Sequence, residues 1–185
     1  MERFGADARV VDSAAGVANA DALVVPGVGA FGACMANLET SRLDRAVVAF
    51  GASGRPLFGV CLGMQLLHEW SEEGGVDGLG LLPGKVRRLH GPVKVPHMGW
   101  NSVAWTRSHP FTAEVAPGGR FYFVHSYACE PDPATTVGEA EHGVRFAAVA
   151  ARGNLFGTQF HPEKSGPDGL ALYARFVEAA REAAR

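Results

Sequence analysis

Short apolar runs that end at glycine or proline recur in the first third of the chain, with a helical pattern between two of them. Residues 22–25 read Ala-Leu-Val-Val and stop at Pro26-Gly27, and residues 57–60 read Leu-Phe-Gly-Val. Residues 43–50 between them place apolar side chains at the spacing of one helix face. Because a strand–helix–strand order favours parallel pairing, the sequence predicts an α/β fold with a doubly wound, mostly parallel open sheet and flanking helices.

The second half of the chain has a different pattern, typical of antiparallel strands. A turn sequence, Arg152-Gly153-Asn154, separates two apolar runs and predicts a hairpin. From Asp168 onward, apolar residues share one helical face and predict a covering helix. The strands that we expect beside these elements are residues 8–11, 85–89, 102–105, 120–127, 146–151 and 155–160.

Length and composition limit the classes of protein that remain. The 185 residues suit a single domain, residues 1–185, and the net charge of −2 gives no reason to expect nucleic acid or a membrane as partner. Three scattered cysteines, Cys34, Cys61 and Cys129, form no CxxC pair, and no HExxH is present. We therefore expect no disulfide, no metal and no cofactor, in a reducing, cytoplasmic compartment.

Cys61 lies at the centre of the motif Gly59-Val60-Cys61-Leu62-Gly63, between a predicted strand and a predicted helix over residues 64–70. Such a sharp strand-to-helix turn with glycines on both sides, called a nucleophile elbow, exposes its central side chain at the edge of the sheet. We expect the helix N-terminus to favour the thiolate and the Leu62 N–H to donate to an oxyanion. The alternative is a cysteine buried between two packing glycines.

A candidate base follows the last predicted strand, in the segment Gln159-Phe160-His161-Pro162-Glu163-Lys164. Residues two apart in an extended segment point the same way, so the Glu163 carboxylate is expected to accept from the His161 ring. A surface loop histidine is the alternative for His161 alone. Together with an elbow cysteine, the pair predicts a Cys61–His161–Glu163 triad.

These motifs together resemble the class I, triad-type glutamine amidotransferases, which have a flavodoxin-like fold. The elbow G-V-C-L-G-M-Q-L, the segment H-P-E-K-S and the glycine-rich loop P-G-V-G occur in the family's order. Within the class, the sequence is similar to the glutaminase subunits of imidazole glycerol phosphate synthase. That similarity depends on the segments K-V-P-H-M-G-W-N and F-Y-F-V-H-S-Y, and it extends from about Ala22 to Phe176.

The resemblance implies roles for further residues. Cys61 would form a glutamyl thioester, His161 would transfer protons, and Glu163 would orient the ring. A solvated Gln65, a core Trp100 and a hydrogen-bonded loop histidine at position 97 remain alternatives. The roles implied are an oxyanion site at Val28, Gly29 and Leu62, substrate binding by Gln65, Glu73, Ser126 and Tyr127, and a partner interface at His97, Trp100 and Lys164.

A second chain is expected to receive the ammonia, because one domain of this size has room for glutamine hydrolysis but no second active site. The resemblance implies a (β/α)8 barrel cyclase subunit, HisF-like, that forms a heterodimer and uses ammonia on a phosphorylated ribonucleotide. Against the family pattern, the sequence lacks an N-terminal strand, a loop and most of a helix, roughly 15–20 residues. The resemblance therefore implies a domain that is truncated at its N-terminus.

Several other functions remain open at this stage. Glutaminase subunits that serve anthranilate or pyridoxal phosphate synthesis share the same chemistry, although Met64 differs from the histidine usual in the anthranilate elbow. A γ-glutamyl hydrolase would act without a partner. A redox sensor or chaperone on a flavodoxin-like fold would need an activated Cys61 but no His161–Glu163 pair.

Overall fold

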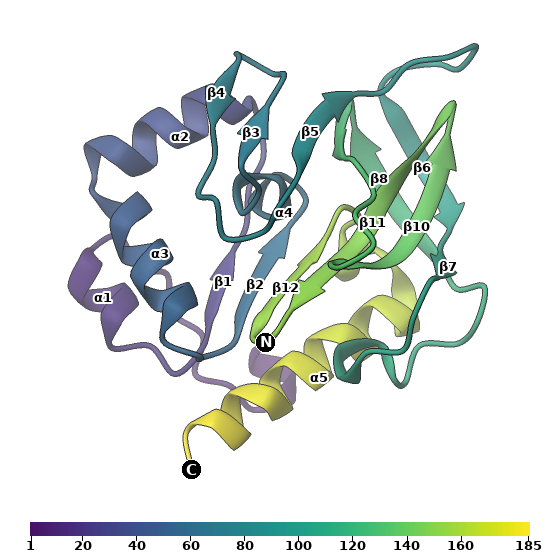
Figure 1. Ribbon diagram of the computed structural model, residues 1–185. Helices are drawn as coiled ribbons and strands as arrows, with labels where there is room; N and C mark the ends of the chain where they lie inside the picture. The colour runs from purple at the N-terminus through teal and green to yellow at the C-terminus, as the bar shows by residue number, and fades with distance from the viewer.

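The computed structural model describes residues 1–185, and its centre is a six-stranded mixed sheet (Figure 1). β1, β2 and β12 are parallel to one another, whereas β12, β11, β10 and β7 are antiparallel. The parallel and antiparallel halves therefore meet at β12, in agreement with the predicted change of pattern along the chain. In sheet order the strands are β1 (Leu23–Val25), β2 (Leu57–Val60), β12 (Leu155–Thr158), β11 (Val144–Arg152), β10 (Thr136–His142) and β7 (Ala104–Trp105).

Two smaller sheets lie beside the central one. The first has four strands in the order β4-β3-β5-β9, and the second pairs β6 with β8 in antiparallel register. Figure 1 shows the long loop between β5 and β6 projecting beyond both. The strands are β3 (Trp70–Ser71), β4 (Val76–Asp77), β5 (Lys85–Arg88), β6 (His97–Ser102), β8 (Arg120–His125) and β9 (Tyr127–Cys129).

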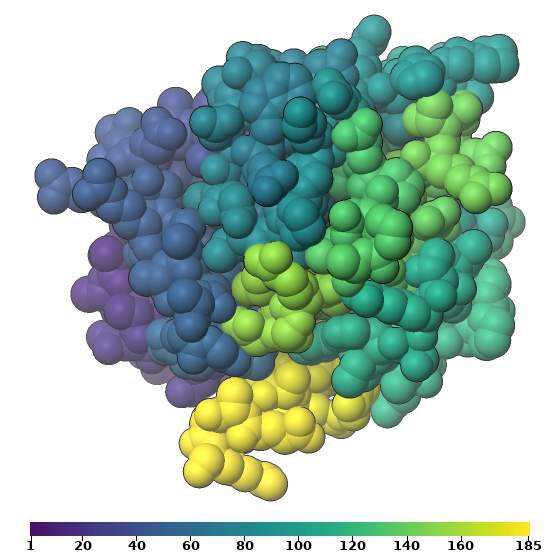
Figure 2. Space-filling model, viewed as in Figure 1, coloured from purple at the N-terminus to yellow at the C-terminus, as the bar shows by residue number.

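Helices cover both faces of the central sheet, and β2 shows how. Leu57 belongs to the apolar cluster beneath α2 and α3, while Phe58 contacts Tyr173 and Phe176 of α5. Adjacent residues of a strand face opposite sides, so these helices form two separate layers. The helices are α1 (Ala14–Ala18), α2 (Phe31–Thr40), α3 (Leu43–Ala52), α4 (Leu62–Leu66) and α5 (Gly166–Ala183), with short 3₁₀ turns η1 (Glu2–Phe4), η2 (Pro110–Thr112) and η3 (Pro162–Lys164). In the space-filling view, α5 forms the lower margin of the molecule (Figure 2).

Four of the expected elements differ from the structure. The run 120–127 is divided at Ser126 between β8 and β9, which belong to different sheets. Residues 8–11 form no strand, and Val10 is fully exposed, because nothing pairs with this segment. The helix after the elbow ends at Leu66, and Trp70 begins β3. Residues 102–105 are divided between β6 and β7, because the buried Val103 lies between the two strands.

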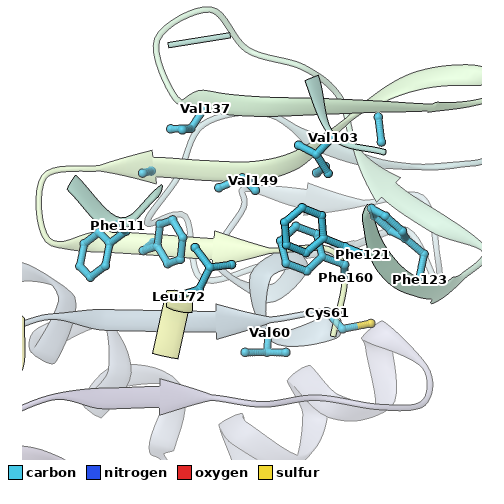
Figure 3. Packing of buried hydrophobic residues seen from close by; sticks show 14 of the residues in the cluster. Val60, Cys61, Val103, Phe111, Phe121, Phe123, Val137, Val149, Phe160 and Leu172 are labelled. Atoms are coloured by element: carbon cyan, nitrogen blue, oxygen red, sulfur yellow. The ribbon is translucent and has the colours of Figure 1, made fainter. Parts of the chain in front are cut away.

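Aromatic side chains fill the core between α5 and the carboxyl ends of the strands. Phe121 of β8 stacks on Phe160 at a centroid distance of 4.1 Å, and Phe123 meets Phe160 edge to face. Figure 3 shows Cys61 at the end of β2 beside this cluster, with its sulfur directed away from it. The core thus brings the segment before His161 close to the end of β2, which carries Cys61. No helix has both the length and the apolar character that crossing a membrane requires.

Candidate active site

The turn that carries Cys61 is a tight strand-to-helix junction. Cys61 has φ of 54° and ψ of −111°, a backbone conformation that non-glycine residues rarely adopt. A Cβ at Gly59 would lie 2.8 Å from the Met64 backbone nitrogen, and one at Gly63 would collide with the Val25 carbonyl oxygen. The flanking glycines are therefore required by close backbone packing, and the strained residue between them is a functional candidate.

The surroundings of Cys61 act on its thiol in opposite directions, and the Leu62 N–H at the start of α4 favours the thiolate as expected. Burial is the largest influence and, with the nearby Glu163 carboxylate, raises the pKa of Cys61 to about 11. Hydrogen bonds from the Leu62 N–H and the Gln159 side chain lower the pKa by less. The loss of hydration therefore outweighs the hydrogen bonds that favour the thiolate.

His161 and Glu163 lie beside the elbow because β12 pairs with β2. The Cys61 N–H donates to the Thr158 carbonyl oxygen at 2.7 Å, so the two strands end together. The Nδ1 of His161 lies 2.8 Å from Oε1 of Glu163. A carboxylate is an acceptor, so Nδ1 carries the proton and Nε2 is free to accept one. The Tyr173 hydroxyl donates to the other carboxylate oxygen at 3.3 Å.

Gln65 is buried, which excludes the alternative of a solvated side chain. Its Nε2 donates to the Tyr127 carbonyl oxygen at 2.8 Å and to Oε1 of Gln159 at 3.0 Å. Gln159 in turn donates to the sulfur of Cys61 over 3.7 Å. Gln159 is not among the residues predicted for the site, although its place two residues before His161 was a signal that it lies here. Ser126 precedes β9, and its carbonyl oxygen accepts from the Leu89 N–H.

The glycine-rich loop after β1 packs directly on the elbow. A Cβ at Gly27 would lie 2.9 Å from the Gly63 nitrogen, and Gly29 has a φ of 97°. Val28 is 84% exposed, so this part of the loop faces solvent. Oε2 of Glu73 accepts from the Phe31 N–H at 2.9 Å, which holds the start of α2. The loop is therefore in reach of the Leu62 N–H, while the oxyanion role of Val28 and Gly29 stays a prediction.

With this geometry established, comparison with known proteins identifies the family. Residues 3–180 match the family described as glutamine amidotransferase class-I. The chain belongs to that family. It is 49% identical to the imidazole glycerol phosphate synthase subunit HisH of Halobacterium salinarum, over 96% of this chain and 84% of that protein. It is 46% identical to the subunit of the same name from Moorella thermoacetica, over 99% of this chain and 88% of that protein.

Solved structures of amidotransferases have the same fold. A crystal structure described as a glutamine amidotransferase superposes with a TM-score of 0.74 and 20% identity, over 97% of this chain and 89% of that one. The glutaminase domain of CTPS from Trypanosoma brucei, solved with bound acivicin, gives a TM-score of 0.65 and 18% identity over 91% and 74% of the two chains. At these identities the likeness extends to the fold, and it agrees with the α/β architecture described above.

The predicted interface residues of this amidotransferase lie on or beside the small sheet of β6 and β8. Trp100 is 49% exposed and meets Tyr122 of β8 edge to face, which excludes the alternative of a core tryptophan. Lys164 places Nζ 5.6 Å from the centre of the same Tyr122 ring. His97 differs, because its ring is buried behind β6. It therefore does not offer a contact surface, and Met98 is exposed next to it instead.

Proposed function

We propose that this chain hydrolyses glutamine to glutamate and ammonia with Cys61, His161 and Glu163, as the glutaminase subunit of imidazole glycerol phosphate synthase in histidine biosynthesis. The observation that carries the proposal is the 2.8 Å contact between His161 and Glu163 beside an elbow cysteine, in a glutamine amidotransferase. The relatives named HisH support the pathway, since they match nearly the whole chain. They favour it over the anthranilate and pyridoxal phosphate branches.

The first half of the reaction forms a thioester. The sulfur of Cys61 attacks the side-chain carbonyl carbon of glutamine as its proton passes to Nε2 of His161. This concerted transfer suits a thiol whose pKa is about 11, because little free thiolate exists at neutral pH. The Leu62 N–H, which hydrogen-bonds to Cys61, stabilises the oxyanion as it forms. The C–N bond then breaks, and His161 gives its proton to the departing ammonia.

The second half regenerates the enzyme. Nε2 of His161 removes a proton from water, which attacks the thioester carbonyl. The C–S bond breaks as glutamate forms, and His161 returns the proton to the sulfur of Cys61. Glu163 holds Nδ1 protonated throughout, which keeps Nε2 in the form that accepts protons. Tyr173, on α5, orients the far oxygen of the carboxylate. Gln65 and Glu73 would hold the amino-acid end of glutamine, and Ser126 and Tyr127 would line the pocket.

The ammonia passes to a cyclase subunit with a (β/α)8 barrel, HisF-like, docked on the exposed face of β6. Free ammonia is mostly protonated in neutral water, so a covered route preserves the nucleophile. Met98 and Trp100, both exposed, supply apolar area, and the Lys164 cation lies beside them. Such a mixture of aromatic and charged groups is typical of interfaces. All three cysteines are unpaired, which suits a reducing, cytoplasmic setting for this subunit.

The deciding experiment measures glutamate release by this chain alone and with the barrel cyclase subunit and its ribonucleotide ligand. Weak release alone and strong release in the complex, abolished by Cys61→Ala, is the expected result. Equal release with and without the partner would favour a free-standing γ-glutamyl hydrolase. If the protein were instead a redox sensor that uses Cys61 alone, Glu163→Ala would not change its function.

A further inference from the structure

A continuous series of hydrogen bonds runs behind β6 and ends at the sulfur of Cys61. It begins where Nδ1 of His97 lies 3.0 Å from Nε2 of His125, its neighbour across β6 and β8. Nδ1 of His125 lies 2.9 Å from the Tyr127 carbonyl oxygen, which also accepts from Gln65. The side chains of Gln65 and Gln159 complete the path to Cys61. We call these five groups the buried relay: His97, His125, the Tyr127 carbonyl, Gln65 and Gln159.

One carbonyl group fixes the proton positions of both histidines. The Tyr127 oxygen can only accept, so Nδ1 of His125 carries a hydrogen and its Nε2 does not. Nδ1 of His97 must then be the donor to that nitrogen. Both rings are neutral in this arrangement: burial lowers the pKa of His125 to about 3 and that of His97 to about 4. Each bond of the relay therefore has a defined donor: the histidines donate toward the Tyr127 carbonyl from one side, and Gln65 donates to the same oxygen from the other.

The near end of the relay acts on the nucleophile. Gln159 is completely buried, and its amide has two partners, Gln65 at the oxygen and Cys61 at the nitrogen. Its N–H donation to sulfur stabilises negative charge there, so it lowers the pKa of the Cys61 thiol. Because the Gln65 bond fixes which end of the amide faces the sulfur, Gln159 holds the thiol only while Gln65 holds Gln159.

The far end of the relay lies behind the proposed docking face. Along β6, His97 and Asn101 point inward, while Met98 and Trp100 point outward. Nδ2 of Asn101 lies 3.4 Å from Nε2 of His97 and donates to the Glu141 carbonyl oxygen. A displacement of β6 would therefore act on His97 directly. His125 and Gln65 hold the same Tyr127 carbonyl oxygen, so a shift of the histidine pair moves the acceptor on which the position of Gln65 depends.

We infer that the buried relay positions the Cys61 thiol, and that it links the state of β6 to the reactivity of the nucleophile. Gln159 is the positioning residue at the sulfur, and the His97–His125 pair sets how firmly its amide is held. The first part concerns this chain alone. The link to docking rests on the proposed function, because it requires a partner on β6.

Alkylation of Cys61 by iodoacetamide at pH 9, followed by mass spectrometry of the Cys61 peptide, tests the relay in the chain alone. Only thiolate reacts, so the rate reports the pKa of the thiol. Gln159→Leu should slow alkylation about tenfold, the equivalent of one pKa unit. His97→Phe keeps the ring stack but removes the donor, and it should slow alkylation about threefold. His97→Gln restores an N–H donor and should recover most of that loss.

His142→Phe is the matched control. His142 stacks on His97 at 4.2 Å, but its own hydrogen bond goes to the Lys94 carbonyl and not to the relay. Cys61 of the His142→Phe variant should be alkylated at the wild-type rate. Equal rates in Gln159→Leu and wild type would overturn the role of Gln159. A loss in Gln159→Leu without any in His97→Phe, or an equal loss in His142→Phe, would overturn the link to β6.

Glutamine kinetics in the complex with the barrel subunit give a second, separable readout. If docking acts through the relay, His97→Phe should lower the stimulation of kcat by the partner about fivefold and leave KM for glutamine unchanged. Full stimulation in His97→Phe would overturn the link to docking. Absence of stimulation in the wild type would count against the proposed function instead, while the alkylation rates would still decide whether the relay acts on Cys61.

Discussion

The two halves of the candidate triad are held in place by different means. Around Cys61, backbone packs against backbone, and Gly59 and Gly63 leave no space for a side chain. Around His161, the ring is buried, but Glu163 is 46% exposed and is held by hydrogen bonds to His161 and Tyr173. The nucleophile side therefore depends on sterics, while the base side depends on polar contacts. Changes of volume should disrupt the first, and changes of hydrogen bonding should adjust the second.

The strongest test of this contrast adds one methyl group at the elbow. Gly63→Ala places a Cβ against the Val25 carbonyl oxygen, so we expect a loss of about 3 kcal/mol or more in unfolding free energy. Urea unfolding followed by circular dichroism measures it. Gly32→Ala is the matched control. Gly32 lies within α2, and a Cβ there would meet only the Val76 side chain, at 3.7 Å. There the added methyl should be neutral or stabilising; equal losses in both variants would refute the steric account.

On the base side, Glu163→Gln should leave the fold intact and lower the activity. The amide can donate to Nδ1 as well as accept from it, so the imidazole loses its fixed tautomer and its stabilisation as a cation. We expect kcat for glutamine to fall about 100-fold, with little change in the urea midpoint. Steady-state glutamate release in the complex and urea unfolding together check this. A variant that unfolds like Gly63→Ala would mean that both halves depend on packing.

The two buried histidines should make the stability of the fold depend on pH. Burial lowers the pKa of His97 to about 4 and that of His125 to about 3, from 6.5. Below pH 6.5 the unfolded chain binds protons that the folded chain does not, so stability should fall as pH falls from 6.5 toward 4. Each histidine contributes a slope of about 1.4 kcal/mol per pH unit. His125→Phe should therefore show a shallower decline in urea unfolding between pH 6.5 and 4.5, whatever its stability at neutral pH.

The smallest effect is expected at Tyr173. Its hydroxyl donates to Glu163 at 3.3 Å, a long bond to a half-exposed carboxylate. Tyr173→Phe should lower kcat only about twofold to fivefold, because the bond to His161 remains. Comparison with Glu163→Gln in the same assay separates orientation of the carboxylate from its charge. A loss as large as that of Glu163→Gln would show that the tyrosine is required and does not merely assist.

Much of the fold and of the triad follows from short stretches of sequence. The elbow at Cys61, the hairpin at Gly153 and the His161–Glu163 contact each depend on sterics and spacing within a few residues. The structure has all three. Residues 8–11 were predicted to form a strand, and they do not. A short apolar run forms a strand only where a neighbour supplies hydrogen bonds, and no local pattern reveals whether one is present.

What the sequence by itself determined was the chemistry: a cysteine on a strained turn, with a histidine and a carboxylate two residues apart. Only the tertiary structure decided the environment of that chemistry. It buried His97 instead of exposing it, raised the pKa of Cys61, and joined Gln65 to Gln159 across 94 positions of sequence. Burial and hydrogen bonding between distant segments depend on how the whole chain packs, whereas turn geometry depends on adjacent residues.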